Sequence, residues 1–188
     1  MKIASWNINS LRRRQERLLA WLGTFAPDIV CLQETKCTDD QFPELALRCA
    51  GYHSVFHGQK SYNGVAILAR TEPQEVERGL GDEVEDPQAR VIAATIGDVR
   101  VFSIYAPNGQ AVGSAPYRYK LEWYERLTRR LTSAGSRART LVVGDFNVAP
   151  NDEDVHDPAL WQDAIMCSAP ERAAFRALGA IGVRYSPR

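Results

Sequence analysis

Residues Leu141 to Val148 read LVVGDFNV and mark the centre of the predicted fold. The first part of this stretch is short, β-branched and uncharged, which predicts a buried strand over residues 140–143. Gly144 allows the backbone to open, or to approach another group closely, where this strand ends. If the extended geometry continues, side chains two residues apart share one side, so we expect Asp145 and Asn147 together. A carboxylate and an amide presented in this way suit a cation and a phosphate, and an ordinary Asx turn is the alternative.

Composition limits the class of protein. The chain has 188 residues, which predicts a single domain over residues 1–188. Its hydrophobic content of 45% and charged content of 24% are ordinary for a globular protein. The 23 basic and 23 acidic residues balance, so any binding of nucleic acid has to come from a local basic patch.

The cysteines form neither a redox motif nor a zinc site. The four cysteines contain no CxxC pair, and the three histidines do not complete a zinc spacing. Cys31 lies in an apolar run and is expected to be a buried thiol. The first residues lack the pattern of a signal peptide, and no apolar run approaches the roughly 20 residues of a membrane span. These features predict a cytoplasmic protein.

The hydrophobic pattern predicts a mixture of strands and helices. Strands are expected over residues 2–6, 28–32, 52–57, 65–69, 90–96, 99–105 and 140–143, and helices over residues 11–22, 41–49, 117–131 and 170–178. We expect Ser10 to cap the first helix. Residues 71–88 predict a polar connection with at most a short strand. The first strand, helix and strand form a βαβ-like unit.

Polar residues stand where four of the predicted strands end. They are Asn7, Glu34 with its neighbour Gln33, Tyr105, and the pair Asp145 and Asn147. If the sheets stack face to face, these side chains are expected to converge at one rim. Mg²⁺ needs only one or two protein carboxylates, because it keeps water and a substrate phosphate as further ligands. Glu34 and Asp145 supply that number, whereas the alternative is a set of unrelated loop residues.

A run of arginines follows the first of these polar residues. Arg12, Arg13, Arg14 and Arg17 lie on the predicted helix over residues 11–22. A charge run on a helix is usually a solvated face. The alternative is a patch that faces phosphates beside the start of the helix.

Five short motifs, taken in order, resemble those of the exonuclease III family. They are WNIN at residues 6–9, LQETK at 32–36, YNGVA at 62–66, YAPNG at 105–109 and GDFN at 144–147. The family comprises Mg²⁺-dependent DNA-repair nucleases within the endonuclease/exonuclease/phosphatase superfamily. The resemblance implies an α/β four-layer sandwich, in which helices flank two mixed β-sheets. It also implies cleavage at abasic sites and at 3′ ends of double-stranded DNA by a monomer, with Mg²⁺ or alternatively Mn²⁺.

The resemblance also implies roles for individual residues. By it, Glu34 binds the metal together with Asn7 and Asp145, and Asp145 orients or deprotonates the attacking water. Asn147 contacts the scissile phosphate, and Tyr105 stabilises the phosphate or the leaving oxygen. Weaker candidates for contacts with phosphates or the DNA backbone are Arg90, Asn108, Gln110 and Lys120. For each of these four, a solvated surface position is the alternative.

The sequence departs from the family near its end, after residues 179–184, for which the resemblance implies a strand or turn. It has neither the Ser-Asp-His segment nor the aromatic-rich Trp-Asp-Tyr-like segment of that family, whose members are longer. We therefore expect a C-terminally truncated fold, with low stability and reduced activity. Two other functions remain open: a small-molecule phosphoesterase of the same superfamily, and a non-catalytic remnant that binds DNA or metal. An enclosed pocket would favour the former.

Overall fold

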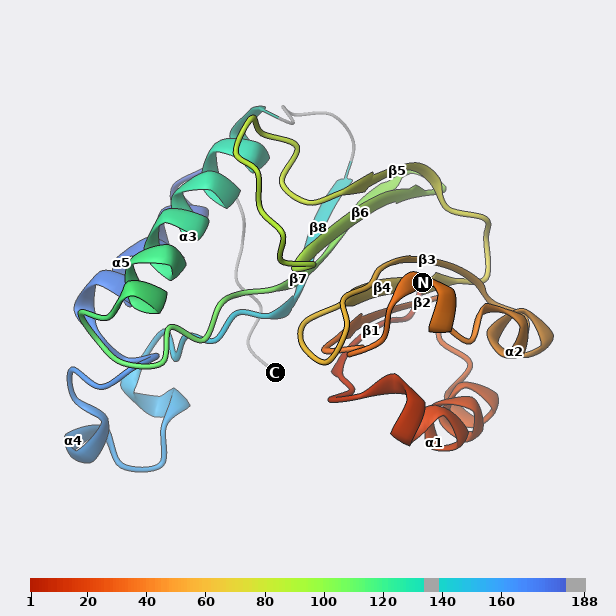
Figure 1. Cartoon of the computed structure of the whole chain (residues 1–188), viewed down its shortest axis with the longest axis horizontal. Coiled ribbons are helices and arrows are strands. Elements are labelled where there is room, and N and C mark those ends of the chain that lie inside the picture. Colours follow the sequence, from red (N-terminus) through yellow and green to blue (C-terminus); the bar gives the residue numbers. More distant parts are fainter. Residues whose placement is uncertain (134–138, 182–188) are drawn as a thin grey trace. The chain divides into compact units, whose positions relative to one another are not determined.

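The computed structural model describes residues 1–133 and 139–181, which divide into two compact units (Figure 1). The first unit contains residues 1–105 and the strand Arg139–Asp145, and the second contains the other described residues. The single domain expected over residues 1–188 stays a prediction. The strand or turn implied over residues 179–184 is wrong for residues 179 and 180, which end a helix, and residues 182–184 lie outside the described residues.

Two mixed four-stranded sheets form the centre of the first unit. The first sheet has the order β1 (Ile3–Asn7), β2 (Ile29–Gln33), β4 (Val65–Ala69), β3 (His53–His57), and the second has the order β5 (Gln74–Arg78), β6 (Val91–Ile96), β7 (Val99–Tyr105), β8 (Arg139–Asp145). In each sheet one outer pair is parallel, β1 with β2 and β7 with β8, and the other pairs are antiparallel. The strands expected at residues 52–57 and 65–69, and at residues 90–96 and 99–105, are confirmed and form two antiparallel pairs.

The alternation of side chains along β2 divides the core of this unit in two. Ile29 and Cys31 pack in one cluster, which also contains residues of β6 and β7, so the two sheets face each other there. Val30 and Leu32 point to the opposite face. Every residue of β2 is buried, as expected for a strand that is covered on both sides. Cys31 has no exposed surface, which confirms the expected buried thiol, and this burial raises the pKa of the thiol to about 12.

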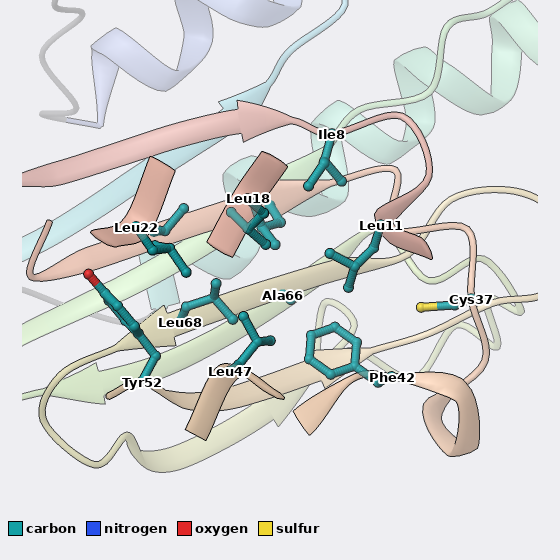
Figure 2. Packing of buried hydrophobic residues seen from close by; sticks show 12 residues of the cluster. Ile8, Leu11, Leu18, Leu22, Cys37, Phe42, Leu47, Tyr52, Ala66 and Leu68 are labelled. Carbon is teal, nitrogen blue, oxygen red and sulfur yellow. The ribbon is translucent and has the colours of Figure 1, made fainter. Parts of the chain in front are cut away.

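Two helices cover the outer face of the first sheet. Leu18 and Leu22 of α1 (Leu11–Phe25) and Leu47 of α2 (Glu44–Cys49) pack against Ala66 and Leu68 of β4 (Figure 2). Each fully buried leucine contributes roughly 1.5–3 kcal/mol. The helix expected over residues 41–49 begins later than predicted, after a short 3-10 turn, η1 (Asp39–Gln41).

The start of α1 differs from the prediction that Ser10 caps it. Ser10 has a φ of 87° and makes no capping hydrogen bond with its side chain. Its backbone N–H donates to the carbonyl of Glu34 (2.8 Å), and that of Leu11 donates to the carbonyl of Thr35 (2.9 Å). The first N–H groups of the helix are thus satisfied by a distant loop, which ties this loop to the helix.

The second unit is helical. It contains α3 (Ala115–Ser133), η2 (Asp152–Asp154), α4 (Pro158–Trp161) and α5 (Ala169–Ala180), and α3 packs against α5. Ser168 and Glu171 form a capping box at the start of α5, where Pro170 lies in the first turn as predicted. Within the described ranges, the structure contains no helix with the length and apolar character of a membrane span. The two mixed sheets and their helices confirm the predicted α/β class.

Candidate active site

Four strand ends of the first unit bring polar side chains together. Asn7 ends β1, Glu34 directly follows β2, Tyr105 ends β7 and Asp145 ends β8. The parallel register pairs Asn7 with Gln33 and Tyr105 with Asp145, so each sheet presents two neighbouring strand ends. This is the convergence that the sequence predicted for the residues of this unit.

The side-chain amide of Asn7 joins the two carboxylates. Its Nδ2 donates to Oε1 of Glu34 (2.7 Å) and to Oδ2 of Asp145 (2.9 Å). Its Oδ1 accepts a hydrogen bond from the backbone N–H of Asn9 (3.1 Å), which sets the orientation of the amide. Because both carboxylates bond to the same amide, they lie close enough together to contact one ion or water molecule. Direct binding of a metal by Asn7 stays a prediction.

The carboxylate of Glu34 is half-buried and bonded on several sides. Lys36 Nζ lies 2.7 Å from Oε2 and also donates to Oδ1 of Asn9 (2.6 Å). Burial raises the pKa of Glu34, but the hydrogen bonds from Lys36 and Asn7, the charge of Lys36 and a hydrogen bond with Tyr105 outweigh it. The pKa of Glu34 therefore lies below its usual 4.5, and the side chain is an anion at neutral pH.

The loop that carries Glu34 is held against a neighbouring turn. The backbone N–H groups of Thr35 and Lys36 donate to the carbonyls of Gly64 (3.1 Å) and Asn63 (3.0 Å). A Cβ at residue 64 would lie 2.1 Å from Thr35 Oγ1, and the φ of Gly64 is +88°. Only glycine allows this close approach. The NG dipeptide at residues 63–64 therefore helps to place Glu34.

Tyr105 is half-buried beside Glu34 and Arg90. Burial, the largest cause, and the charge of Glu34 raise the pKa of Tyr105 to about 12, against the opposing charge of Arg90. The guanidinium of Arg90 lies 4.9 Å from the centre of the Tyr105 ring and donates to its backbone carbonyl (3.1 Å). Tyr105 thus keeps its phenolic proton at neutral pH and can donate a hydrogen bond.

The glycine before Asp145 permits a close approach of two strands. Gly144 has a φ of +151°, and a Cβ there would lie 1.9 Å from the carbonyl oxygen of Ile104 on β7. The strand continues to Asp145 instead of ending at residue 143. It does not continue to Asn147, whose φ is +49°, so the extended geometry assumed in placing Asp145 and Asn147 on one side does not hold.

The remaining predicted residues belong to the second unit. Asn147 Nδ2 donates to the carbonyl of Ala106 (2.8 Å). Asn108 and Gln110 are exposed, as a contact with DNA requires. Lys120 does not fit the prediction: its side chain is completely buried, and its ammonium forms an ion pair with Glu171. A residue with no exposed surface contradicts both the predicted phosphate contact and the solvated alternative.

A basic groove adjoins Glu34 through Lys36. It has a volume of about 680 Å³ and is lined by Asn9, Ser10, Arg13, Arg14, Arg17, Lys36 and Ser61. Three arginines of α1 therefore share a groove with a loop residue, which favours the phosphate-facing alternative over a merely solvated face. Lys36 is not among the site residues predicted above, although its place two residues after Glu34 was the available signal.

The residues of this site suit a hard divalent cation such as Mg²⁺ or Mn²⁺, which prefers oxygen ligands. Among the described residues, no three or more His, Cys, Asp or Glu side chains group into a metal cluster. Mg²⁺ does not need one, since one or two carboxylates with water and phosphate complete its octahedral shell. Glu34 and Asp145, held by a single amide, provide that donor set.

A comparison with protein families decides the relationship. A model described as the Endonuclease/Exonuclease/phosphatase family matches residues 4–184. The chain belongs to this family. Two relatives named exodeoxyribonuclease III and exodeoxyribonuclease match 100% and 93% of this chain, which confirms the resemblance given by the five motifs.

Three relatives show how close the similarity of this family member is. The exodeoxyribonuclease III of Haemophilus influenzae is 34% identical over 200 residues, covering 100% of this chain and 75% of that protein. A Neisseria structure described as the 3′ phosphatase NExo bound to a product DNA hairpin is 44% identical with a TM-score of 0.95, covering 97% of this chain and 71% of that chain. An AP endonuclease from Archaeoglobus fulgidus is 40% identical with a TM-score of 0.92, with coverages of 97% and 71%. Nucleases of the exonuclease III type generally depend on a divalent metal ion.

Proposed function

We propose that this member of the family is a DNA-repair nuclease that hydrolyses phosphodiester bonds in double-stranded DNA, at abasic sites or at 3′ ends. Its metal ion is Mg²⁺, with Mn²⁺ as the alternative. The observation that carries the proposal is the Asn7 amide, which holds the carboxylates of Glu34 and Asp145 at 2.7 and 2.9 Å. The relatives support it, because they are named for reactions on DNA.

The proposed roles follow from the chemistry of each side chain. Glu34 and Asp145 would hold the ion, which supplies positive charge that neutralises the phosphate. Asp145 orients the attacking water or accepts its proton. Asn147 donates a hydrogen bond to the phosphate, and Tyr105, which keeps its proton, donates to the phosphate or the leaving oxygen.

The groups around these residues are proposed to bind DNA. Arg13, Arg14 and Arg17 give the groove beside Lys36 the positive charge that a phosphate backbone attracts. Arg90, Asn108 and Gln110 are proposed as further contacts. We also propose that the protein acts as a monomer in the cytoplasm, a setting that suits the free thiols found among the described residues.

The test is cleavage of a duplex that carries one abasic-site analogue, with Mg²⁺, with Mn²⁺ and with EDTA. The wild-type chain is expected to cut beside the analogue only when metal is present. Glu34→Gln should lower the rate about 100-fold or more, because removing a charge-stabilising group commonly has an effect of this size. The melting temperature should stay close to that of the wild type.

A matched control is Glu44→Gln, which removes the carboxylate of an exposed ion pair with Arg48 on α2. This variant should cleave at the wild-type rate. A folded chain that leaves the duplex intact with either metal contradicts the proposal. Hydrolysis of a small phosphodiester such as bis(p-nitrophenyl) phosphate, without cleavage of DNA, would instead favour the small-molecule phosphoesterase.

A further inference from the structure

Lys120 has a position that the proposed roles do not explain. It comes from the middle of α3 and has an exposed fraction of 0%, as does its partner Glu171 on α5. A charge is costly to bury unless it is paired and hydrogen-bonded. This burial excludes a surface role for Lys120, so the role of its ammonium group depends on contacts inside the second unit.

The ammonium group of Lys120 connects three segments of the second unit. Besides the Glu171 carboxylate, it donates to the backbone carbonyl of Asn108 (3.1 Å) and to that of Asn147 (2.6 Å). Asn108 belongs to the loop after Tyr105, and Asn147 to the loop after Asp145. One side chain therefore ties both loops to the helix pair.

Asn147 is held at its backbone and at its side chain. Its carbonyl accepts from Lys120, and its Nδ2 donates to the carbonyl of Ala106 (2.8 Å). Its φ of +49° lies in the left-handed region, which asparagine tolerates better than most residues other than glycine. The hydrogen bonds at its carbonyl and at its side-chain amide hold it in this conformation. The bond from Lys120 is one of these two restraints.

Further hydrogen bonds hold the carboxylate of Glu171 in place, and this carboxylate in turn holds the ammonium group of Lys120. Its Oε1 accepts from the backbone N–H of Met166 (3.0 Å) as well as from Lys120. Its Oε2 accepts from the backbone N–H (3.2 Å) and from Oγ (2.6 Å) of Ser168. Ser168 Oγ also forms a hydrogen bond with the hydroxyl of Tyr117 (2.8 Å) on α3. The start of α5 thus anchors the counter-charge of Lys120.

We propose that Lys120 is a positioning residue for Asn147. By holding the carbonyl of Asn147, its ammonium group fixes the conformation from which the side-chain amide meets the phosphate. Glu171 provides the counter-charge that makes the buried ammonium tolerable. The inference rests on the proposed function, in which Asn147 contacts the phosphate, and a misplacement of about 1 Å can lower a rate 100-fold.

The test uses a variant that removes both charges of the pair, Lys120→Met/Glu171→Gln. Neutralising both partners leaves no unpaired buried charge, so this variant should fold. It lacks the bond to the Asn147 carbonyl, and kcat on the abasic duplex should fall about 10- to 100-fold, with KM changed less than about twofold. The control Leu178→Ala removes a buried apolar side chain from α5, the helix that carries Glu171. It should lower the melting temperature and leave kcat unchanged.

A double-mutant cycle with Asn147→Ala separates positioning from a general structural role. The variant Lys120→Met/Glu171→Gln is called the neutral-pair variant. If Lys120 acts through Asn147, combining the neutral-pair substitutions with Asn147→Ala should slow the reaction no further than Asn147→Ala alone. Independent, multiplying losses would overturn the proposal. So would a neutral-pair variant with wild-type kcat.

A second readout does not need cleavage. The side-chain amide signals of Asn147 in a ¹H–¹⁵N NMR spectrum can be assigned by their loss in Asn147→Ala. In the neutral-pair variant they should shift and exchange with solvent faster, and unchanged signals would overturn the proposal. If the wild-type chain does not cleave DNA, the proposed function fails, and this spectrum still decides whether Lys120 positions Asn147.

Discussion

In the described part of the chain, each unit has a lysine–glutamate pair that includes or contacts a residue of the proposed reaction, and the two pairs differ in exposure. In the first unit, Lys36 and Glu34 have side-chain exposures of 27% and 18%. In the second unit, Lys120 and Glu171 are at 0%. The same two functional groups therefore stand in different surroundings.

The surroundings decide what each pair can do. Glu34 accepts from Lys36 and Asn7 and is open to solvent, so it can exchange one partner for a metal ion or a water molecule. Glu171 is enclosed by protein donors, and a change of partner would strand a charge in the interior. We call Lys36–Glu34 the open pair and Lys120–Glu171 the closed pair. The open pair can take part in a reaction, whereas the closed pair can hold other groups in place.

The largest expected effect is on stability, and it separates the two pairs directly. Lys120→Met leaves the buried carboxylate of Glu171 without its cation and should lower the free energy of unfolding by about 3–5 kcal/mol. Lys36→Met removes the cation of the open pair and should cost less than about 1 kcal/mol. Urea unfolding of both variants at neutral pH measures the difference. Equal losses would mean that burial does not distinguish the pairs.

The second prediction concerns the groove that Lys36 of the open pair lines. Arg13→Ala/Arg14→Ala should weaken the binding of duplex DNA about 10-fold or more and reduce the salt dependence, because fewer phosphates are neutralised. Fluorescence anisotropy of a labelled duplex, titrated at several salt concentrations, measures both. Arg48→Ala is the control, since Arg48 is an exposed arginine on α2 outside the groove. A loss of the same size in the control would assign the effect to net charge alone.

The comparison also shows which parts of the molecule could be read from the sequence. The strands and the meeting of Asn7, Glu34 and Asp145 were predictable, because hydrophobic periodicity marks the strands and strand ends share an edge. The partner of Lys120 was not, since helical periodicity places a lysine on a face but does not name a carboxylate on another helix. The prediction that the Ser10 side chain caps α1 was wrong for the same reason. The backbone N–H of Ser10 instead bonds to the carbonyl of Glu34, a residue far away in sequence.

The third prediction tests whether the charge of Glu34 raises the pKa of the neighbouring Tyr105. Tyr105 should titrate near pH 12, as its raised pKa requires. Glu34→Gln removes a negative charge beside the phenol, so the pKa of Tyr105 should fall. It should remain above its usual 10, because burial is the largest cause and persists. The ¹³C signal of the Tyr105 ring, assigned with Tyr105→Phe, follows the titration, and an unchanged pKa in Glu34→Gln would show that the charge does not reach the ring.

The smallest expected effect is the pH dependence of the open pair. The pKa of Glu34 is below 4.5 in the folded protein, so its contribution to stability is complete above that pH and is lost as the pH falls through the folded pKa. Lys36→Met removes a hydrogen bond and a charge that lower this pKa, so the loss should begin at a less acidic pH. The difference should stay below about 1 kcal/mol, because the side chains are partly exposed. Urea unfolding from about pH 6 to about pH 3 would reveal it, with Arg48→Met as the control at an exposed pair. If both variants follow the wild-type profile, the bond from Asn7 rather than the one from Lys36 keeps Glu34 ionised.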